Sequence, residues 1–252
     1  MNTTDNIIKQ CTDKSCTLYD FWIHFVNLNQ VSNLAEIGVL NGNYAEKILS
    51  NCDSIQTYYM IDPWRYLDDW NKPANKEDNI MEQFFLEAKI NTDFAANKRV
   101  ILRGKTTEVV EEIPDNELEF AYIDGDHTLK GIAIDLIRLF PKIRDGGWIG
   151  GDDFSKTVWQ HSTIFEPTLV FPFAVYFAEA VGAQIYALPN SQFLIEKNKD
   201  QAFAFIDLTG DYVDTSLRKQ FRLDNILKLK LKETFIWKVA RRAKQLLSSK
   251  NL

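Results

Sequence analysis

The sequence predicts an α/β protein with a doubly wound, mostly parallel sheet and helices on both faces, and two observations support this fold class. The first is a set of short apolar runs typical of buried strands, near 33–37, 57–62, 99–103, 119–124 and 147–152. The second is the set of helical stretches between them, near 43–50, 78–90, 106–112 and 128–140. Because each parallel connection needs a right-handed crossover, this alternation covers both faces of the sheet with helices. Ligands of such sheets bind at the carboxyl ends of the strands.

A hairpin is predicted after these five strands. Beyond a helical stretch near 170–181, the apolar runs 183–188 and 191–196 are joined by Pro189-Asn190. A tight turn of this kind between two short strands predicts an antiparallel strand at the sheet edge. The apolar run 202–208 is a candidate for one more edge strand.

Both ends of the chain are predicted to be helical. Residues 17–30 have the spacing of an amphipathic helix that leads into the first strand. From about Leu217 the chain becomes basic, with apolar positions at Phe221, Ile226, Leu227, Phe235, Ile236, Val239, Leu246 and Leu247. We therefore divide the chain into an N-terminal helical segment, 1–30, a central domain, 31–208, and a basic helical tail, 209–252.

The composition is that of an ordinary globular protein, and a cytoplasmic location is the default expectation. Of 252 residues, 45% are hydrophobic and 25% charged, and no run approaches the length of apolar sequence needed to cross a bilayer. Residues 1–20 lack the apolar centre of a signal peptide. Cys11, Cys16 and Cys52 are odd in number and lack Cys-x-x-Cys spacing, which argues against a disulfide framework or a zinc site.

Charge is distributed unevenly along the chain. The net charge is −6, but residues 218–250 carry +9, so the remainder carries −15. An acidic body disfavours nucleic acid as a partner. The basic end is predicted to meet an anionic membrane surface, a partner or the body of the protein itself. A second copy of the chain is also compatible with the sequence.

The segment from Glu36 to Gly42 predicts a cofactor loop. It runs from a strand through Gly38 and Gly42 into a helix, and glycines there allow a tight turn and a close approach of backbone to ligand. The spacing is Glu-x-Gly-x-x-x-Gly, whereas a dinucleotide site has Gly-x-Gly-x-x-Gly. This counts against an NAD-linked oxidoreductase, while an ordinary glycine-containing turn remains the simplest alternative.

Two further strand ends are candidate cofactor contacts. Asp62 ends the second strand, where an acid can accept both ribose hydroxyls of a nucleoside, although an Asp-Pro pair is also a common turn. Trp64 is placed to lie against an adenine ring, although a lone aromatic is more often part of the core. Gly104-Lys105-Thr106 follows the third strand and is placed to frame the adenine, unless it is a simple loop.

The densest group of polar residues follows the fourth and fifth strands. Phe120 to His127 ends in Asp-Gly-Asp-His, and Gly146 to Phe154 contains an Asp-Asp pair. The two strand ends deliver Asp124, Asp126, His127, Asp152 and Asp153 into one region. Clustered carboxylates repel one another unless a cation or proton compensates them, which favours a divalent ion such as Mg²⁺. Helix capping explains one or two of these acids but not all five.

Taken together, these motifs resemble the class I S-adenosylmethionine-dependent methyltransferases over residues 30–197. Within that class they are most similar to metal-dependent O-methyltransferases of the catechol and macrocin type. The resemblance implies a Rossmann-like, seven-stranded sheet that ends in an antiparallel hairpin. It also implies that Glu36 contacts the methionine part of the cofactor, that Gly38 and Gly42 make room for the cofactor, and that Asp62 binds its ribose.

The resemblance also implies a metal site and a base. The acid of the fourth strand corresponds to Asp124, beside the cofactor, and together with Asp152 and Asp153 it would hold Mg²⁺. Catechol-type enzymes have a lysine shortly after that acid, whereas this chain has His127, with Lys130 three residues further on. An imidazole suits removal of a hydroxyl proton, and the alternative role of His127 is to orient Asp126 or to cap the next helix. Asp153, Lys156 and His161 are the alternatives for the base.

The function that follows is transfer of a methyl group from S-adenosylmethionine to a hydroxyl, assisted by a divalent ion. Residues 64–70 and 154–173 are predicted to shape the acceptor site, because they combine aromatic and polar side chains. The Asp-Asp pair resembles the sugar-modifying branch of that class, since catechol-type enzymes have Asn in the last position, and this resemblance implies a sugar or glycoside hydroxyl as acceptor. The alternatives are a phenolic or catechol hydroxyl, and a noncatalytic subunit that only binds the cofactor.

Overall fold

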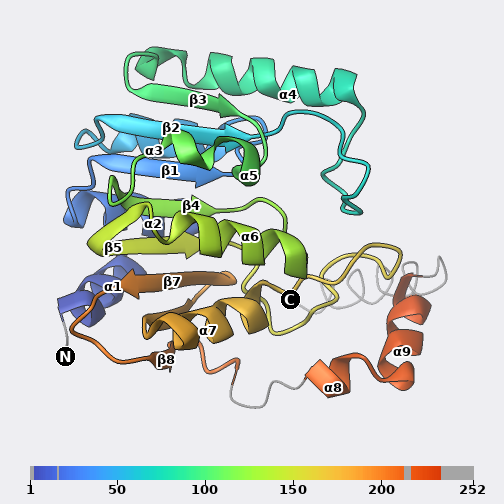
Figure 1. Cartoon of the computed structure of the whole chain (residues 1–252). Helices are drawn as coiled ribbons and strands as arrows, with labels where there is room; N and C mark the ends of the chain where they lie inside the picture. The colour runs from blue at the N-terminus through green and yellow to red at the C-terminus, as the bar shows by residue number, and fades with distance from the viewer. Residues whose placement is uncertain (1–2, 16, 213–216, 234–252) are drawn as a thin grey trace, which may run out of the picture.

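The computed structural model describes residues 3–15, 17–212 and 217–233, and its centre is a single mixed sheet (Figure 1). The sheet has eight strands in the order β3-β2-β1-β4-β5-β7-β6-β8. The strands are β1 (Asn33–Ile37), β2 (Thr57–Asp62), β3 (Arg99–Arg103), β4 (Leu118–Ile123), β5 (Ile143–Gly151), β6 (Gln184–Leu188), β7 (Gln192–Lys197) and β8 (Ala204–Asp207). The prediction of a mostly parallel α/β sheet is confirmed, with one strand more than the seven expected.

The hairpin does not end the sheet. β7 runs antiparallel to both β5 and β6, and β6 pairs in parallel with β8, which forms the edge. The turn of the hairpin has positive φ at Asn190 and Ser191, 60° and 57°, as the tight connection requires. The extra strand lies in the run 202–208, so the expectation of an edge hairpin is corrected by one added strand.

Helices cover both faces of the sheet, as Figure 1 shows. One layer contains α1 (Thr3–Lys14), α2 (Leu18–Leu28), α3 (Asn43–Asn51) and α4 (Asp78–Asn91). The other contains α5 (Thr106–Val109), α6 (Leu129–Leu139) and α7 (Val170–Val181). The short 3-10 turns η1 (Asp93–Ala95) and η2 (Val110–Glu112) and the helices α8 (Leu217–Gln220) and α9 (Leu223–Glu233) complete the described elements.

Alternation along the strands separates two hydrophobic clusters. In β4, Phe120 belongs to the cluster under α1 to α4, and its neighbour Ala121 belongs to the cluster under α5 to α7. Trp22 of α2 stacks on Phe120 with 5.2 Å between ring centroids. Gly150 of β5 allows this approach, because a Cβ there would lie 2.4 Å from the Trp22 ring. The N-terminal segment therefore packs directly on the central sheet.

The parallel strands bring the residues of the candidate site together at their carboxyl ends. Ile37 of β1 pairs with Ile123 of β4, and Ile123 pairs with Gly151 of β5. The segments after these strands therefore start side by side. This register places Gly38, Asp124 and Asp152 at neighbouring positions, as the sequence predicts.

The basic tail is described only in part. α8 and α9 confirm helix over much of 217–233, and the predicted apolar positions from Phe235 onward lie outside the described residues. Within the described ranges, none of the helices has the length and apolar character needed to cross a bilayer.

Candidate functional site

The loop after β1 is built around two glycines with positive φ. Gly38 has φ +86°, and its N–H donates to the Ile61 carbonyl at 2.9 Å. A Cβ at Gly38 would lie 2.2 Å from the carbonyl oxygen of Asp124. Gly42, with φ +79°, precedes α3, and a Cβ there would lie 2.9 Å from the Cα of Ala88. Both positions therefore need glycine, and the loop backbone lies directly against the end of β4.

Asp62 connects this loop to the segment after β2. Its two carboxylate oxygens accept the N–H groups of Leu40 at 2.9 Å and Trp64 at 2.8 Å. Burial raises the pKa of Asp62 to about 6, against the lowering effect of these backbone hydrogen bonds. The carboxylate thus acts as a turn-forming group, as the alternative interpretation held. Its predicted contact with a ribose stays a prediction.

Trp64 supports the same two loops from inside the protein. Its ring is 1% exposed, packs on Phe85 with centroids 5.0 Å apart, and donates from Nε1 to the Leu40 carbonyl at 2.6 Å. The side chain therefore offers no ring face at the surface. The core alternative describes this side chain, whose indole hydrogen bond is satisfied inside the loop, and its contact with an adenine stays a prediction.

The segment after β3 is occupied by internal contacts. The Gly104 N–H donates to the Asp62 carbonyl at 3.0 Å. Lys105 is the N-cap residue of α5, and its side chain is exposed. The Thr106 hydroxyl is buried and donates to Asp135 Oδ1 at 2.5 Å. The hydroxyl of Thr106 is thus already engaged, and any framing of the adenine at this loop stays a prediction.

Glu36 lies beneath the glycine loop. It is 1% exposed, and one of its oxygens accepts a hydrogen bond from the Tyr58 hydroxyl at 2.7 Å. Burial raises the pKa of Glu36 to about 8, and the charge of nearby Asp124 adds to the increase. Glu36 is therefore a protonatable group under the loop, and its predicted contact with the methionine part of the cofactor stays a prediction.

His127 stands between two of the predicted acids. Its Nδ1 is hydrogen-bonded to Asp153 Oδ2, and its Nε2 lies 3.4 Å from Asp124 Oδ1. The Nε2 atom is buried and has no hydrogen-bond partner within the described part of the chain. Since Asp153 holds the proton on Nδ1, neutral His127 presents the lone pair of Nε2 beside Asp124. This is the arrangement of an Asp–His dyad.

The charges around His127 oppose the effect of its burial. Burial alone would lower the pKa of His127, but the hydrogen bond to Asp153 and the negative charges of Asp124 and Asp153 raise it to about 10. The same pair lowers the pKa of Asp153 below its ordinary value, although burial acts in the other direction. In the free protein His127 therefore compensates the neighbouring carboxylates with its own positive charge.

Asp152 is held by a residue from the hairpin. Gln192 donates from Nε2 to Asp152 Oδ1 at 2.6 Å, and its Oε1 accepts from the Tyr122 hydroxyl at 2.9 Å and from Trp22 Nε1 at 2.8 Å. Burial raises the pKa of Asp152 to about 7, and Asp124 adds to the increase. Gln192 thus joins α2, β4 and β5 beneath the site. The sequence offers no local signal for this role.

Asp126 and Lys130 do not join the dyad. Asp126 accepts the N–H of Thr128 at 2.9 Å and the indole N–H of Trp70 at 2.9 Å. Lys130 is exposed and pairs with Asp69 at 2.6 Å. Both residues therefore attach the segment after β2 to the start of α6. Lys130, the lysine nearest to the position that catechol-type enzymes use, is therefore paired at the surface.

The predicted metal ligands do not form a metal site as they are arranged. Asp153 faces His127 and accepts from Gln160 Nε2 at 2.8 Å, while Asp152 accepts from Gln192. Within the described residues there is no group of three or more His, Cys, Asp or Glu side chains placed to hold a metal ion. The carboxylates have the right chemistry for Mg²⁺, but His127 occupies the position between two of them.

The segment just beyond the first predicted acceptor loop contacts the second loop. Lys72 is buried and donates from Nζ to the Glu166 carbonyl at 2.9 Å and to the Thr168 hydroxyl at 3.1 Å. Burial lowers its pKa, although Asp126 and Asp153 act in the other direction. The sequence analysis did not identify Lys72, because a single lysine in a loop has no distinguishing pattern.

The remaining candidate bases lie on the second of these loops. His161 packs edge-on to Phe165 with centroids 6.2 Å apart, and burial lowers its pKa. Lys156 pairs with Asp211 at 2.6 Å at the surface. Neither residue is hydrogen-bonded to Asp153, the carboxylate that orients His127. His127 therefore remains the base that the geometry favours.

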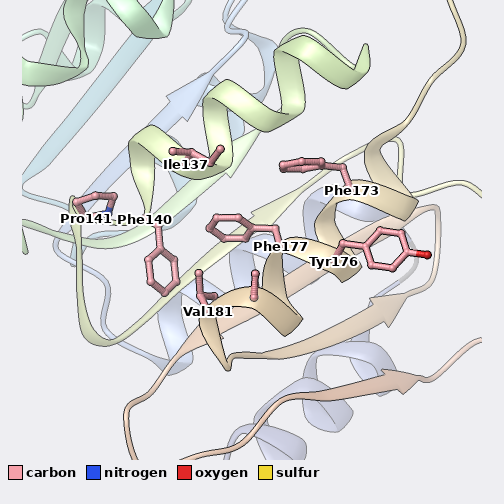
Figure 2. Close-up of a pocket in the computed structure, with 8 residues that line it drawn as sticks. Ile137, Phe140, Pro141, Phe173, Tyr176, Phe177 and Val181 are labelled. Carbon is pink, nitrogen blue, oxygen red and sulfur yellow. The ribbon is translucent and has the colours of Figure 1, made fainter.

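An apolar hollow lies elsewhere, between α6 and α7 (Figure 2). Its volume is about 450 Å³, and it is lined by Ile137, Phe140, Pro141, Phe173, Tyr176, Phe177, Ala180 and Val181. Phe140 follows the last residue of α6, and Val181 is the last residue of α7, so both lie toward the amino ends of the parallel strands. No acid or base lines the hollow, so it is separate from the candidate site.

Comparison with known proteins agrees with this geometry. Residues 35–154 match the model of a family described as a methyltransferase domain. A candidate caffeoyl-CoA O-methyltransferase from Staphylococcus aureus has a TM-score of 0.56 at 16% identity, covering 78% of this chain and 93% of that one. An O-methyltransferase from Bacillus cereus, solved in complex with SAH, has a TM-score of 0.54 at 16% identity, covering 79% and 92%.

A third structure, the O-methyltransferase NovP, has a TM-score of 0.51 at 17% identity, covering 77% of this chain and 79% of that one. No curated protein matches the sequence. At these identities the solved structures establish the shared fold. The family match runs from the residue before Glu36 to the residue after Asp153, so it spans both halves of the candidate site.

Proposed function

We propose that this chain, a class I methyltransferase that uses S-adenosylmethionine, transfers a methyl group to a hydroxyl of a sugar or glycoside. The observation that carries the proposal is the Asp153–His127 pair, which leaves His127 Nε2 without a hydrogen bond at 3.4 Å from Asp124. This nitrogen lies near the carboxyl ends of β1 and β4, on the side of the glycine loop. The site thus combines a cofactor loop with an oriented base.

The cofactor half consists of groups at the ends of β1, β2 and β4. Gly38 and Gly42 keep the loop free of Cβ atoms, and Asp62 fixes its position from beneath. Asp124 is 41% exposed, so its carboxylate faces solvent at the same edge. These residues would hold S-adenosylmethionine. When bound, it supplies a methyl group that is already activated by its sulfonium charge.

The residues of this chain then have two tasks, alignment and proton removal. Methyl transfer needs an in-line approach of the acceptor oxygen, and alignment of the two reactants supplies much of the rate. As the acceptor oxygen bonds to the methyl carbon, the bond from that carbon to sulfur breaks, S-adenosylhomocysteine is left, and the hydroxyl proton moves to Nε2 of His127. Asp153 keeps the Nδ1 proton in place and stabilises the imidazolium that results. General-base catalysis of this kind contributes roughly 10²–10⁴-fold.

The acceptor class is inferred from the two loops beside the dyad. They carry Trp70, His161 and Phe165 together with the polar side chain of Gln160, and Lys72 lies two residues beyond the first loop. Aromatic faces with polar groups between them suit the two sides of a sugar ring. The neighbours in fold are O-methyltransferases by name, which supports oxygen as the atom methylated. A phenolic hydroxyl is the alternative acceptor.

Metal assistance is a second form of the proposal. It is favoured by Asp124, Asp152 and Asp153, whose carboxylates are the oxygen donors that Mg²⁺ prefers. They would hold an ion only after His127 turns away from Asp153. In that form the ion would make the hydroxyl more acidic and would take over the charge compensation that His127 provides.

Methyl transfer from labelled S-adenosylmethionine to a panel of sugar and phenolic acceptors tests the proposal. Each assay is run with Mg²⁺ and with a chelator, because the two forms differ in that response. We expect labelled ether products from sugar acceptors, and loss of product in His127→Asn. Transfer to nitrogen or carbon acceptors only, or full activity of His127→Asn, would contradict the proposal.

A further inference from the structure

Helix α9 carries an exposed apolar face that the proposed reaction does not use. Leu223, Leu227 and Leu231 are 78%, 60% and 62% exposed. They are spaced by four residues, so they lie along one side of the helix. A continuous stripe of exposed apolar side chains indicates a surface that interacts with a protein, a membrane or a ligand.

The charges beside this face identify the kind of partner. Lys228, Lys230 and Lys232 are exposed on the same helix, and the segment 218–250 carries +9, whereas the rest of the chain carries −15. Two copies of α9 would bring like charges together. A helix with leucines on one side and lysines around them has the composition of a helix that lies in the plane of an anionic bilayer surface.

The distribution of charge also fixes which way the protein would face. The acidic body is repelled by an anionic surface, and only the basic segment is attracted to it. Contact would therefore be made with α9 toward the lipid. The long side chains of the lysines can extend to the headgroups while the leucines enter the boundary of the acyl chains.

α9 is joined through α8 to the loop that supports the dyad. The Gln220 side chain accepts the Val158 N–H at 2.8 Å, and its backbone carbonyl accepts from Trp159 Nε1 at 3.1 Å. The next residue of that loop, Gln160, donates to Asp153 at 2.8 Å. A surface that binds α9 would therefore lie close to the acceptor loop.

We propose that α9 docks the protein on an anionic lipid surface through Leu223, Leu227 and Leu231 and the lysines beside them. The contact is reversible and depends on ionic strength, because each basic residue near such a surface contributes about fivefold to binding. This inference is independent of the methyl-transfer reaction. It requires only the exposed face and the charge of the tail.

Sedimentation with vesicles tests the docking of the full chain. We expect it to sediment with phosphatidylcholine vesicles that contain phosphatidylserine, and to sediment much less with phosphatidylcholine alone or in high salt. The double substitution Leu223→Ser and Leu227→Ser should weaken binding at least tenfold. The matched control is Ile137→Ser with Tyr176→Ser, which removes exposed apolar side chains from the hollow between α6 and α7 and should change nothing.

Several results would overturn the proposal. They are no sedimentation of the full chain, equal binding to both kinds of vesicle, and unchanged binding of the double serine variant. The last result would assign lipid binding to another part of the tail. Thermal unfolding and binding of S-adenosylhomocysteine, both expected to match the unsubstituted chain, check that the variants are folded.

Discussion

The two halves of the candidate site are held in place in different ways. In the cofactor half, Asp62 binds the backbone N–H groups of Leu40 and Trp64, and Gly38 leaves no space for a side chain. In the acceptor half, side chains from distant segments hold one another, as His127 does with Asp153. The first half is encoded in short motifs, whereas the second is formed only when the loops come together.

The largest effect is expected from a substitution in the cofactor half. Gly38→Ala adds a Cβ that would lie 2.2 Å from a backbone oxygen and forces a left-handed conformation on alanine. We expect loss of S-adenosylhomocysteine binding and a decrease of roughly 2–5 kcal/mol in the free energy of unfolding. Calorimetric titration and chemical unfolding measure the two effects.

Gly146→Ala is the matched control for that experiment. Gly146 also has positive φ, +76°, but a Cβ there meets nothing within 4 Å. It should cost only the conformational strain, about 1–2 kcal/mol, and leave cofactor binding intact. Equal effects of the two substitutions would show that the close approach of Gly38 to Asp124 has no special importance.

A substitution in the acceptor half should lower turnover and leave cofactor binding unchanged. His127→Asn removes the base and keeps a side chain of similar size, so we expect turnover to decrease roughly 10²–10⁴-fold while cofactor affinity changes little. The control Lys130→Met breaks an exposed ion pair with Asp69 and should leave turnover within about twofold. A decrease in cofactor affinity equal to the loss of turnover would mean that the halves are not separate.

The pH dependence sharpens the assignment of the base. The raised pKa of His127, about 10, means that the neutral form needed for proton removal is scarce near neutral pH. With Asp153 as its partner, kcat/KM should rise about tenfold per pH unit between pH 7 and 9. A flat profile over this range would assign proton removal to another group.

The same pKa has a consequence for stability. Because the pKa of His127 is higher in the folded protein than its ordinary 6.5, its charge stabilises the fold fully below about pH 6.5. That contribution is lost as the pH rises toward 10. The difference in Tm between the unsubstituted chain and His127→Asn should therefore shrink over this range.

The smallest expected effect concerns the support beneath the acceptor half. Gln192→Leu leaves the Trp22 and Tyr122 donors without their acceptor and releases Asp152. We expect a decrease of roughly 1–3 kcal/mol in the free energy of unfolding and about a tenfold decrease in kcat, with KM little changed. Gln184→Leu, at the other strand of the hairpin, is the control for stability alone, and an equal effect on kcat there would remove the positioning role.

The fold was predictable because hydrophobic periodicity is local. The strand 57–62 and the helix 170–181 have the bounds expected from the sequence. The helix Thr3–Lys14 was not placed individually, since most of its residues are polar and its buried apolar side chains are those of Ile8 and Cys11. Periodicity also left open whether 202–208 adds a strand, because that depends on pairing with β6.

The site was predictable only where a motif carries it. Gly38 and the Asp124–His127 segment were identified from spacing, but Gln192 and Lys72 were not, since their partners lie far away in the sequence. For Trp64 the sequence left open a contact with adenine or a place in the core, and its burial depends on the fold of the loop. Spacing likewise cannot show that an imidazole separates two carboxylates expected to share a metal ion.

The most direct test of the account is a calorimetric titration with S-adenosylhomocysteine, with Mg²⁺ present and then with a chelator. We expect micromolar binding in both conditions, and the same affinity in His127→Asn, because the cofactor half is fixed by Gly38 and Asp62 without the dyad or a metal. Absence of binding in both conditions would contradict the account. The acidic residues after β4 and β5 would then need another explanation.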